Sequence, residues 1–98
     1  MTDLEISKAL AIAIGWTPSK MNSDTKSLWI LESGRLRKFD YRDPMIIWPI
    51  AERYNAFPRR TSESWMALHR KLSPGVSHPY YAYTPEKAVA LAVIAAKK

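Results

Sequence analysis

The stretch that decides the fold is residues 84–96, which read T-P-E-K-A-V-A-L-A-V-I-A-A. Thr84 can accept a backbone hydrogen bond as N-cap, Pro85 suits the first helical position, where its missing N–H would be unpaired anyway, and Glu86 complements the helix dipole. Residues 88–96 have no polar side chain, so the helix is apolar nearly all round. Such a helix must be covered on more than one side. We therefore expect the other elements to pack around it.

The length and composition predict a single domain, residues 1–98, with one core. The chain has 98 residues, 47% of them hydrophobic and four of them Trp, which is enough to fill such a core. There is no cysteine, and His69 and His78 alone fall short of a metal ligand set. We therefore expect no disulfide, no metal and no cofactor.

The charge and the N-terminus bear on partners and location. Fifteen Lys and Arg against nine Asp and Glu give a net charge of +6, which favours acidic partners and also serves solubility. The N-terminus lacks the features of a signal peptide, and its apolar run, residues 9–14, is too short to span a bilayer. We expect a cytoplasmic protein without membrane contact.

The first segment predicts a helix that ends at Gly15. Thr2 and Glu5 have the spacing of a capping box, and Gly15 can stop the helix in a left-handed conformation. Helical spacing predicts a core-facing set consisting of Ile6, Leu10, Ala13 and Ile14. It leaves a solvent-facing set consisting of Asp3, Ser7 and Lys8. Residues 17–26 have the composition of a loop.

Residues 27–32 and 35–41, joined by the turn Ser33-Gly34, predict a hairpin. A period of two places four residues on one face of the second strand, namely Arg35, Arg37, Phe39 and Tyr41. Single-stranded nucleic acid is bound by such a face, with phosphates on arginine and bases stacked on rings. The alternative is that both rings enter the core and that the arginines mark where an edge strand leaves it.

The second half predicts a helix over residues 44–55 and a second hairpin. Pro49 should kink the helix or delay its start. Residues 55–64 have the composition of a loop. Residues 65–72 fit either a helix or a strand, and we favour a hairpin with residues 65–71 and 78–83 as its two arms, joined by a Pro-Gly turn. His69 and His78 would then lie close together as an incidental pair.

Several motifs give the chain a family resemblance. They are A-I-A-I-G-W at residues 11–16, F-D-Y-R-D-P-M-I-I-W-P-I-A-E-R-Y at residues 39–54 and Y-T-P-E-K-A-V-A-L-A at residues 83–92. In this order they resemble small phage proteins with an α-β-α sandwich domain and the NinX-like proteins of lambdoid phages. The resemblance implies a phage or prophage accessory protein. It carries no functional residues to this chain.

These features favour a binding protein over an enzyme. The sequence has no nucleophile–base pair, no paired carboxylates and no phosphate-binding glycine loop. Our first hypothesis is a protein that engages a host macromolecule, most readily a host protein, for instance as an inhibitor of host defence. The second is a nucleic-acid-binding protein, and the third is one that sequesters a small nucleotide signal. The candidate binding residues are Arg35, Arg37, Phe39, Tyr41, Arg42, Arg59, Arg60, Arg70 and Lys71.

The expected architecture is α+β, an antiparallel sheet of two hairpins packed with apolar helices, in the order α-β-β-α-β-β-α. The first and last helices are apolar over more than one face. A second copy could cover part of that surface, most simply across a two-fold axis. A homodimer is therefore a further expectation.

Overall fold

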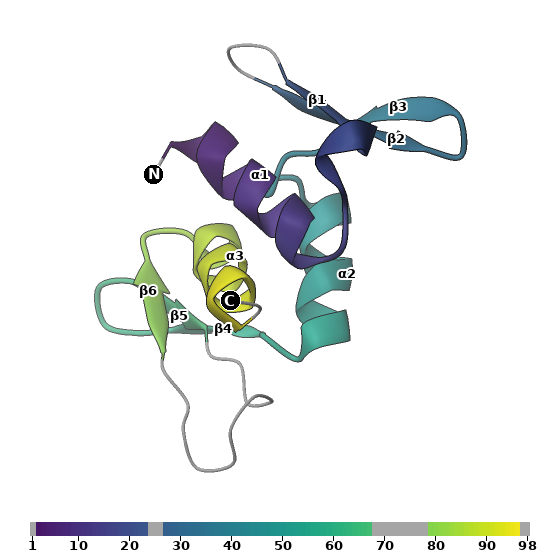
Figure 1. The fold of residues 1–98 in the computed structure, drawn as a ribbon. Helices are drawn as coiled ribbons and strands as arrows, with labels where there is room; N and C mark the ends of the chain where they lie inside the picture. Colours follow the sequence, from purple (N-terminus) through teal and green to yellow (C-terminus); the bar gives the residue numbers. More distant parts are fainter. Residues whose placement is uncertain (1, 24–26, 68–78, 97–98) are drawn as a thin grey trace.

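The structure, a computed structural model, describes residues 2–23, 27–67 and 79–96 (Figure 1). Over these residues the chain forms three α-helices and two three-stranded antiparallel sheets, in the order α-βββ-α-βββ-α. The helices are α1 (Asp3–Ala13), α2 (Pro44–Tyr54) and α3 (Pro85–Ala96), with a short 3₁₀ helix, η1 (Pro18–Lys20). The α+β class is confirmed. The expected single sheet of two hairpins is wrong, because each hairpin gains a third strand in a sheet of its own.

Helix α1 begins and ends as its sequence predicts. The capping box between Thr2 and Glu5 is complete, and its hydrogen bonds hold the pKa of the Glu5 carboxyl below its usual value. At the other end, Gly15 (φ 111°) donates its N–H to the Ile12 carbonyl, and Trp16 donates to that of Ala11. This pair of bonds is a Schellman motif. It turns the chain sharply and places Trp16 against the core.

The solvent-facing set predicted for α1 needs one correction. Ser7 is buried, and its hydroxyl oxygen accepts the backbone N–H of Tyr41 at 3.2 Å. A small hydroxyl side chain can line a core where a backbone donor needs a partner. Helical spacing alone does not reveal that partner, because it lies 34 residues further along the chain.

Helix α2 starts at Pro44 and runs through Pro49 to Tyr54, so the delayed start is not observed. Asp43 caps it by accepting the Met45 N–H, and Asn55 ends it in the left-handed region at φ 54°. Pro49 leaves the carbonyl four residues earlier without its helical donor. That residue is Met45, which is exposed, so water can replace the missing bond.

Helix α3 is the centre of the core, as its apolar sequence predicts. Thr84 caps it, and six of its residues are buried, namely Ala88, Val89, Ala90, Ala92, Val93 and Ile94. α1 and α2 pack on two sides of it, and the second sheet covers a third (Figure 1). The chain itself therefore covers most of the apolar surface of α3, whereas Ile12 on α1 stays exposed. The homodimer remains an untested prediction. No helix in the described part of the chain is long and apolar enough to cross a membrane.

The first sheet has the order β1-β2-β3, with strands β1 (Met21–Ser23), β2 (Leu28–Glu32) and β3 (Arg35–Lys38). β2 and β3 form the predicted hairpin, and its turn residues Ser33 and Gly34 both have positive φ, 52° and 79°. Two such residues make a type I′ turn, which matches the twist of the two strands. β1 lies in a segment that was predicted to be a loop. The prediction failed because the polar residues of β1 pair along the edge of the sheet without entering the core.

The second sheet has the order β4-β5-β6, with strands β4 (Pro58–Arg60), β5 (Trp65–Ala67) and β6 (Tyr80–Ala82). The predicted hairpin of β5 and β6 is confirmed over these residues, and β5 is a strand and not a helix. β4 occupies part of the predicted loop 55–64. The remainder of that hairpin, including the expected pair of His69 and His78, lies outside the described residues.

The burial of α1 leads to a first prediction. Leu10 is fully buried in the core, whereas Ile12 on the same helix is 54% exposed. Leu10→Ala should lower the free energy of unfolding by about 2–5 kcal/mol, through lost burial and a residual cavity. Ile12→Ala, the matched control, should cost less than about 1 kcal/mol. Urea unfolding followed by tryptophan fluorescence measures both, and equal losses would contradict the packing.

Candidate interaction surface

The outer face of the first sheet exposes three large apolar side chains. Trp29 and Leu31 on β2 are 36% and 42% exposed, and Leu36 on β3 is 59% exposed. Leu36 lies directly opposite Leu31, and Lys38 lies opposite Trp29, so the four side chains share one face. We call these four residues the hairpin face.

The opposite face of the same sheet holds it to the rest of the molecule. Leu28 and Ile30 alternate with the exposed residues of β2, and both are buried in the core. β2 packs on α1 through this side. The turn of the hairpin points away from the helices (Figure 1). The hairpin face is therefore presented outward from a fixed base.

Positive charge lies on both faces of β3. Arg35, Arg37 and Lys38 are all exposed on this strand. Arg37 forms an ion pair with Glu32 at 2.9 Å. Among the described residues, no carboxylate lies within ion-pair distance of Arg35 or Lys38. Lys38 belongs to the hairpin face, whereas Arg35 and Arg37 lie on the opposite face of the strand. An apolar patch with polar residues at its rim is typical of a protein–protein interface.

The rings of Phe39 and Tyr41 do not lie on the strand surface with the arginines. β3 ends at Lys38, and the chain then turns into the core, where Phe39 and Tyr41 are only 3% and 2% exposed. The alternating arginine–aromatic face predicted for residues 35–41 is therefore wrong. Apolar rings gain more from burial than from the edge of a sheet. The arginines mark where the strand leaves the core, which was the alternative interpretation.

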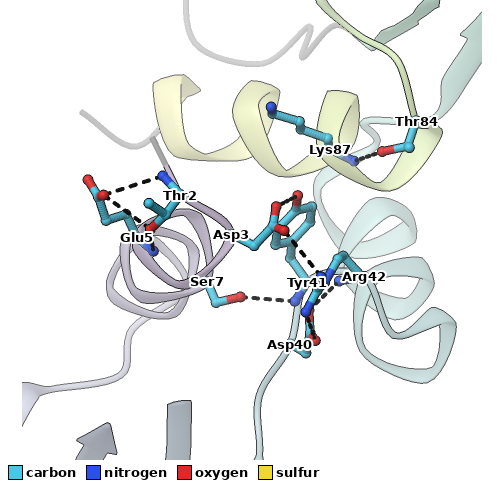
Figure 2. Close-up of polar contacts among 9 residues, drawn as sticks. All are labelled: Thr2, Asp3, Glu5, Ser7, Asp40, Tyr41, Arg42, Thr84 and Lys87. Carbon is cyan, nitrogen blue, oxygen red and sulfur yellow. Dashed lines mark hydrogen bonds and ion pairs between the residues drawn. The ribbon is translucent and has the colours of Figure 1, made fainter. Parts of the chain in front are cut away.

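Tyr41 and Arg42 are held in a polar cluster between α1 and the start of α2 (Figure 2). The Tyr41 hydroxyl donates to Asp3 Oδ1 at 2.5 Å, and Arg42 forms ion pairs with Asp3 at 3.1 Å and Asp40 at 2.8 Å. Burial, reinforced by the bond to Asp3, raises the pKa of Tyr41. Hydrogen bonds from Arg42 lower the pKa of Asp40. This cluster joins residues about 40 positions apart, and its ion pairs already engage the Arg42 guanidinium.

The remaining candidate cations lie elsewhere. Arg59 and Arg60 are on β4, at the far end of the molecule from the β2–β3 hairpin (Figure 1). The Arg60 guanidinium stacks over the Trp65 ring, 5.5 Å from its centroid. Arg70 and Lys71 lie outside the described residues. Of the seven predicted site residues that the structure describes, only Arg35 and Arg37 lie on the hairpin.

An open groove next to the polar cluster has the aromatic and basic side chains that a nucleotide pocket could use. Its lining residues are Asp3, Tyr41, Arg42, Tyr83, Thr84, Glu86 and Lys87. Two of these are carboxylates, which repel phosphate, and Arg42 is already paired with Asp3 and Asp40. The groove therefore suits an anionic nucleotide poorly.

The prediction missed the apolar residues of the hairpin face, although the sequence contains their signal. Residues 28–31 read L-W-I-L, so a strand of period two is apolar on both of its faces. One face packs on α1. The other keeps Trp29, Leu31 and Leu36 partly exposed, and an exposed apolar strand face often marks a site of interaction.

Helix α2 exposes a smaller apolar pair, Met45 and Trp48, one turn apart. The residues that follow this pair on the helix include both an acid and a base, Glu52 and Arg53. Met45 is the more exposed of the two, at 80%. It provides a matched control for substitutions in the hairpin face.

Neither a metal site nor a similarity to a known protein points to a further function within the described residues. Within residues 2–23, 27–67 and 79–96, no group of three His, Cys, Asp or Glu side chains is placed to hold a metal ion. No protein-family model matches the sequence, and neither curated proteins nor solved structures give a significant match.

The polar cluster predicts how stability responds to acid. Because the folded pKa of Asp40 is below the unfolded value of about 3.9, its stabilisation is complete above that value and is lost as pH falls through the folded pKa. Asp40→Asn should therefore flatten the loss of stability below about pH 5. Urea unfolding at several pH values measures this. Glu52→Gln, at an exposed carboxylate without an ion pair among the described residues, should leave the profile unchanged.

Proposed function

We propose that this protein is a non-enzymatic binding protein that engages a host protein through the hairpin face. The observation that carries the proposal is the exposed row of Trp29, Leu31 and Leu36 next to the cations of β3. Tryptophan and arginine are the residues that most often dominate binding energy at protein interfaces. The +6 net charge favours a partner with an acidic rim around an apolar centre.

Nucleic acid is the second candidate, and the cations of β3 are the observation in its favour. Arg35, Arg37 and Lys38 could contact phosphates, and Trp29 could stack on a base. Leu31 and Leu36 do not fit this function, because aliphatic side chains offer no stacking surface. Phe39 and Tyr41, the rings that suggested nucleic acid, are buried. These differences favour a protein partner.

The setting of the proposal rests on the resemblance to small phage proteins alone. We propose a phage or prophage accessory protein that acts in the host cytoplasm, with inhibition of host defence as the activity. Occlusion of a host protein requires a surface and no catalysis. The exposed sheet face could provide such a surface.

A pair of lysine substitutions separates the two candidate partners. Leu36→Lys places a charge in the apolar centre and also adds a cation to the surface. If the partner is a protein, the variant should retain about tenfold less of it in affinity capture from nuclease-treated host lysate. If the partner is nucleic acid, the same variant should bind at least as well as the wild type.

Met45→Lys is the control, because it adds the same charge at an exposed position on α2. It should leave capture of the host protein unchanged. Mass spectrometry identifies and quantifies the captured protein, and thermal unfolding verifies that both variants fold. The proposal is wrong if Leu36→Lys and Met45→Lys capture the same protein equally well.

A further inference from the structure

We infer that the open edge of β3 binds an extended acidic segment of the partner as a fourth, antiparallel strand. This inference rests on the proposed function and specifies how the partner is recognised. Within the described part of the chain, β3 has one neighbouring strand, because it is the last in the order β1-β2-β3. An edge strand of this kind can pair with a peptide through its free backbone groups.

The register shows which backbone groups are free. Phe39 donates its backbone N–H to the Leu28 carbonyl, so this residue faces β2. In an antiparallel pair, bonded and non-bonded positions alternate along the strand. Arg35 and Arg37 therefore also face β2, and the N–H and C=O groups of Leu36 and Lys38 point to the open side. These two residues can form hydrogen bonds with an added strand.

Charge complementarity identifies the chemistry of that strand. All four residues of β3 are exposed, and three of them are cations. Arg35 and Lys38 have no ion pair with a described residue. A second copy of this chain would place its own cations against them and be repelled. An acidic segment would instead place a carboxylate opposite Arg35.

The two faces of the sheet predict the order of residues in that segment. Side chains opposite Leu36 would lie on the hairpin face next to Leu36, so an apolar residue fits there. Side chains opposite Arg35 and Arg37 would lie on the other face, where carboxylates fit. The recognised sequence thus alternates apolar and acidic residues. Cations on an edge strand often serve only to prevent pairing, but the largely exposed Leu36 does not serve that purpose.

The test uses a capped octapeptide of alternating glutamate and valine with the ¹⁵N-labelled protein. Hydrogen exchange should slow at the amides of Leu36 and Lys38 when the peptide binds. The amides of Arg35 and Arg37, already bonded to β2, should change little. Peptide binding that leaves the Leu36 and Lys38 amides unprotected would overturn the inference.

Two backbone-methylated peptides provide the matched controls. In the inferred register the valines lie opposite Leu36 and Lys38, so their N–H groups bond to β3 and those of the glutamates point away. N-methylation of the valines should weaken binding by about tenfold or more, because it removes at least two hydrogen bonds. N-methylation of the glutamates should have little effect.

Equal affinity of the two methylated peptides, or no binding of the parent peptide at millimolar concentration, would also overturn the inference. Neither result bears on whether the hairpin face binds a host protein. If capture of that protein remains sensitive to Leu36→Lys, the proposed function stands and recognition is by side chains alone. If capture is insensitive to this change, the proposed function itself fails.

Discussion

The rest of the structure depends on the burial of one helix that has no polar side. α3 carries apolar residues at every position from 88 to 96, and a single sheet or helix cannot cover such a surface. α1, α2 and the second sheet each cover a part of it. The Asp3–Tyr41–Arg42 cluster then fixes the N-terminus of α1 to the turn before α2. Local capping and distant polar contacts thus support the same packing.

The first sheet has a different position in this arrangement. It reaches the core through one face, with Leu28 and Ile30 of β2 buried and Met21 of β1 packed against the core beside them. Since other elements already cover α3, nothing in the packing requires a second layer over this sheet, and its outer face keeps three large apolar side chains exposed. Exposing them costs free energy in water. A binding role would explain why they are retained.

Local signals in the sequence were enough to predict the helices and the two central hairpins. Thr2, Gly15, Asp43 and Thr84 each act on neighbouring residues, so their effects can be predicted without the fold. The third strand of each sheet could not be predicted, because β1 and β4 are short and polar and are defined by pairing with distant strands. The site was predicted only in part. Arg35 and Arg37 are exposed as expected, but the burial of Phe39 and Tyr41 depends on a strand that ends at Lys38.

The most direct test of the central claim is site-specific photo-crosslinking in the host cell. A photoreactive phenylalanine analogue would replace Leu36 in one variant and Met45 in another, both exposed positions on different elements. A binding site on the hairpin face predicts one dominant protein adduct from position 36 and none from position 45. Adducts mainly to nucleic acid, or the same protein adduct from both positions, would contradict it.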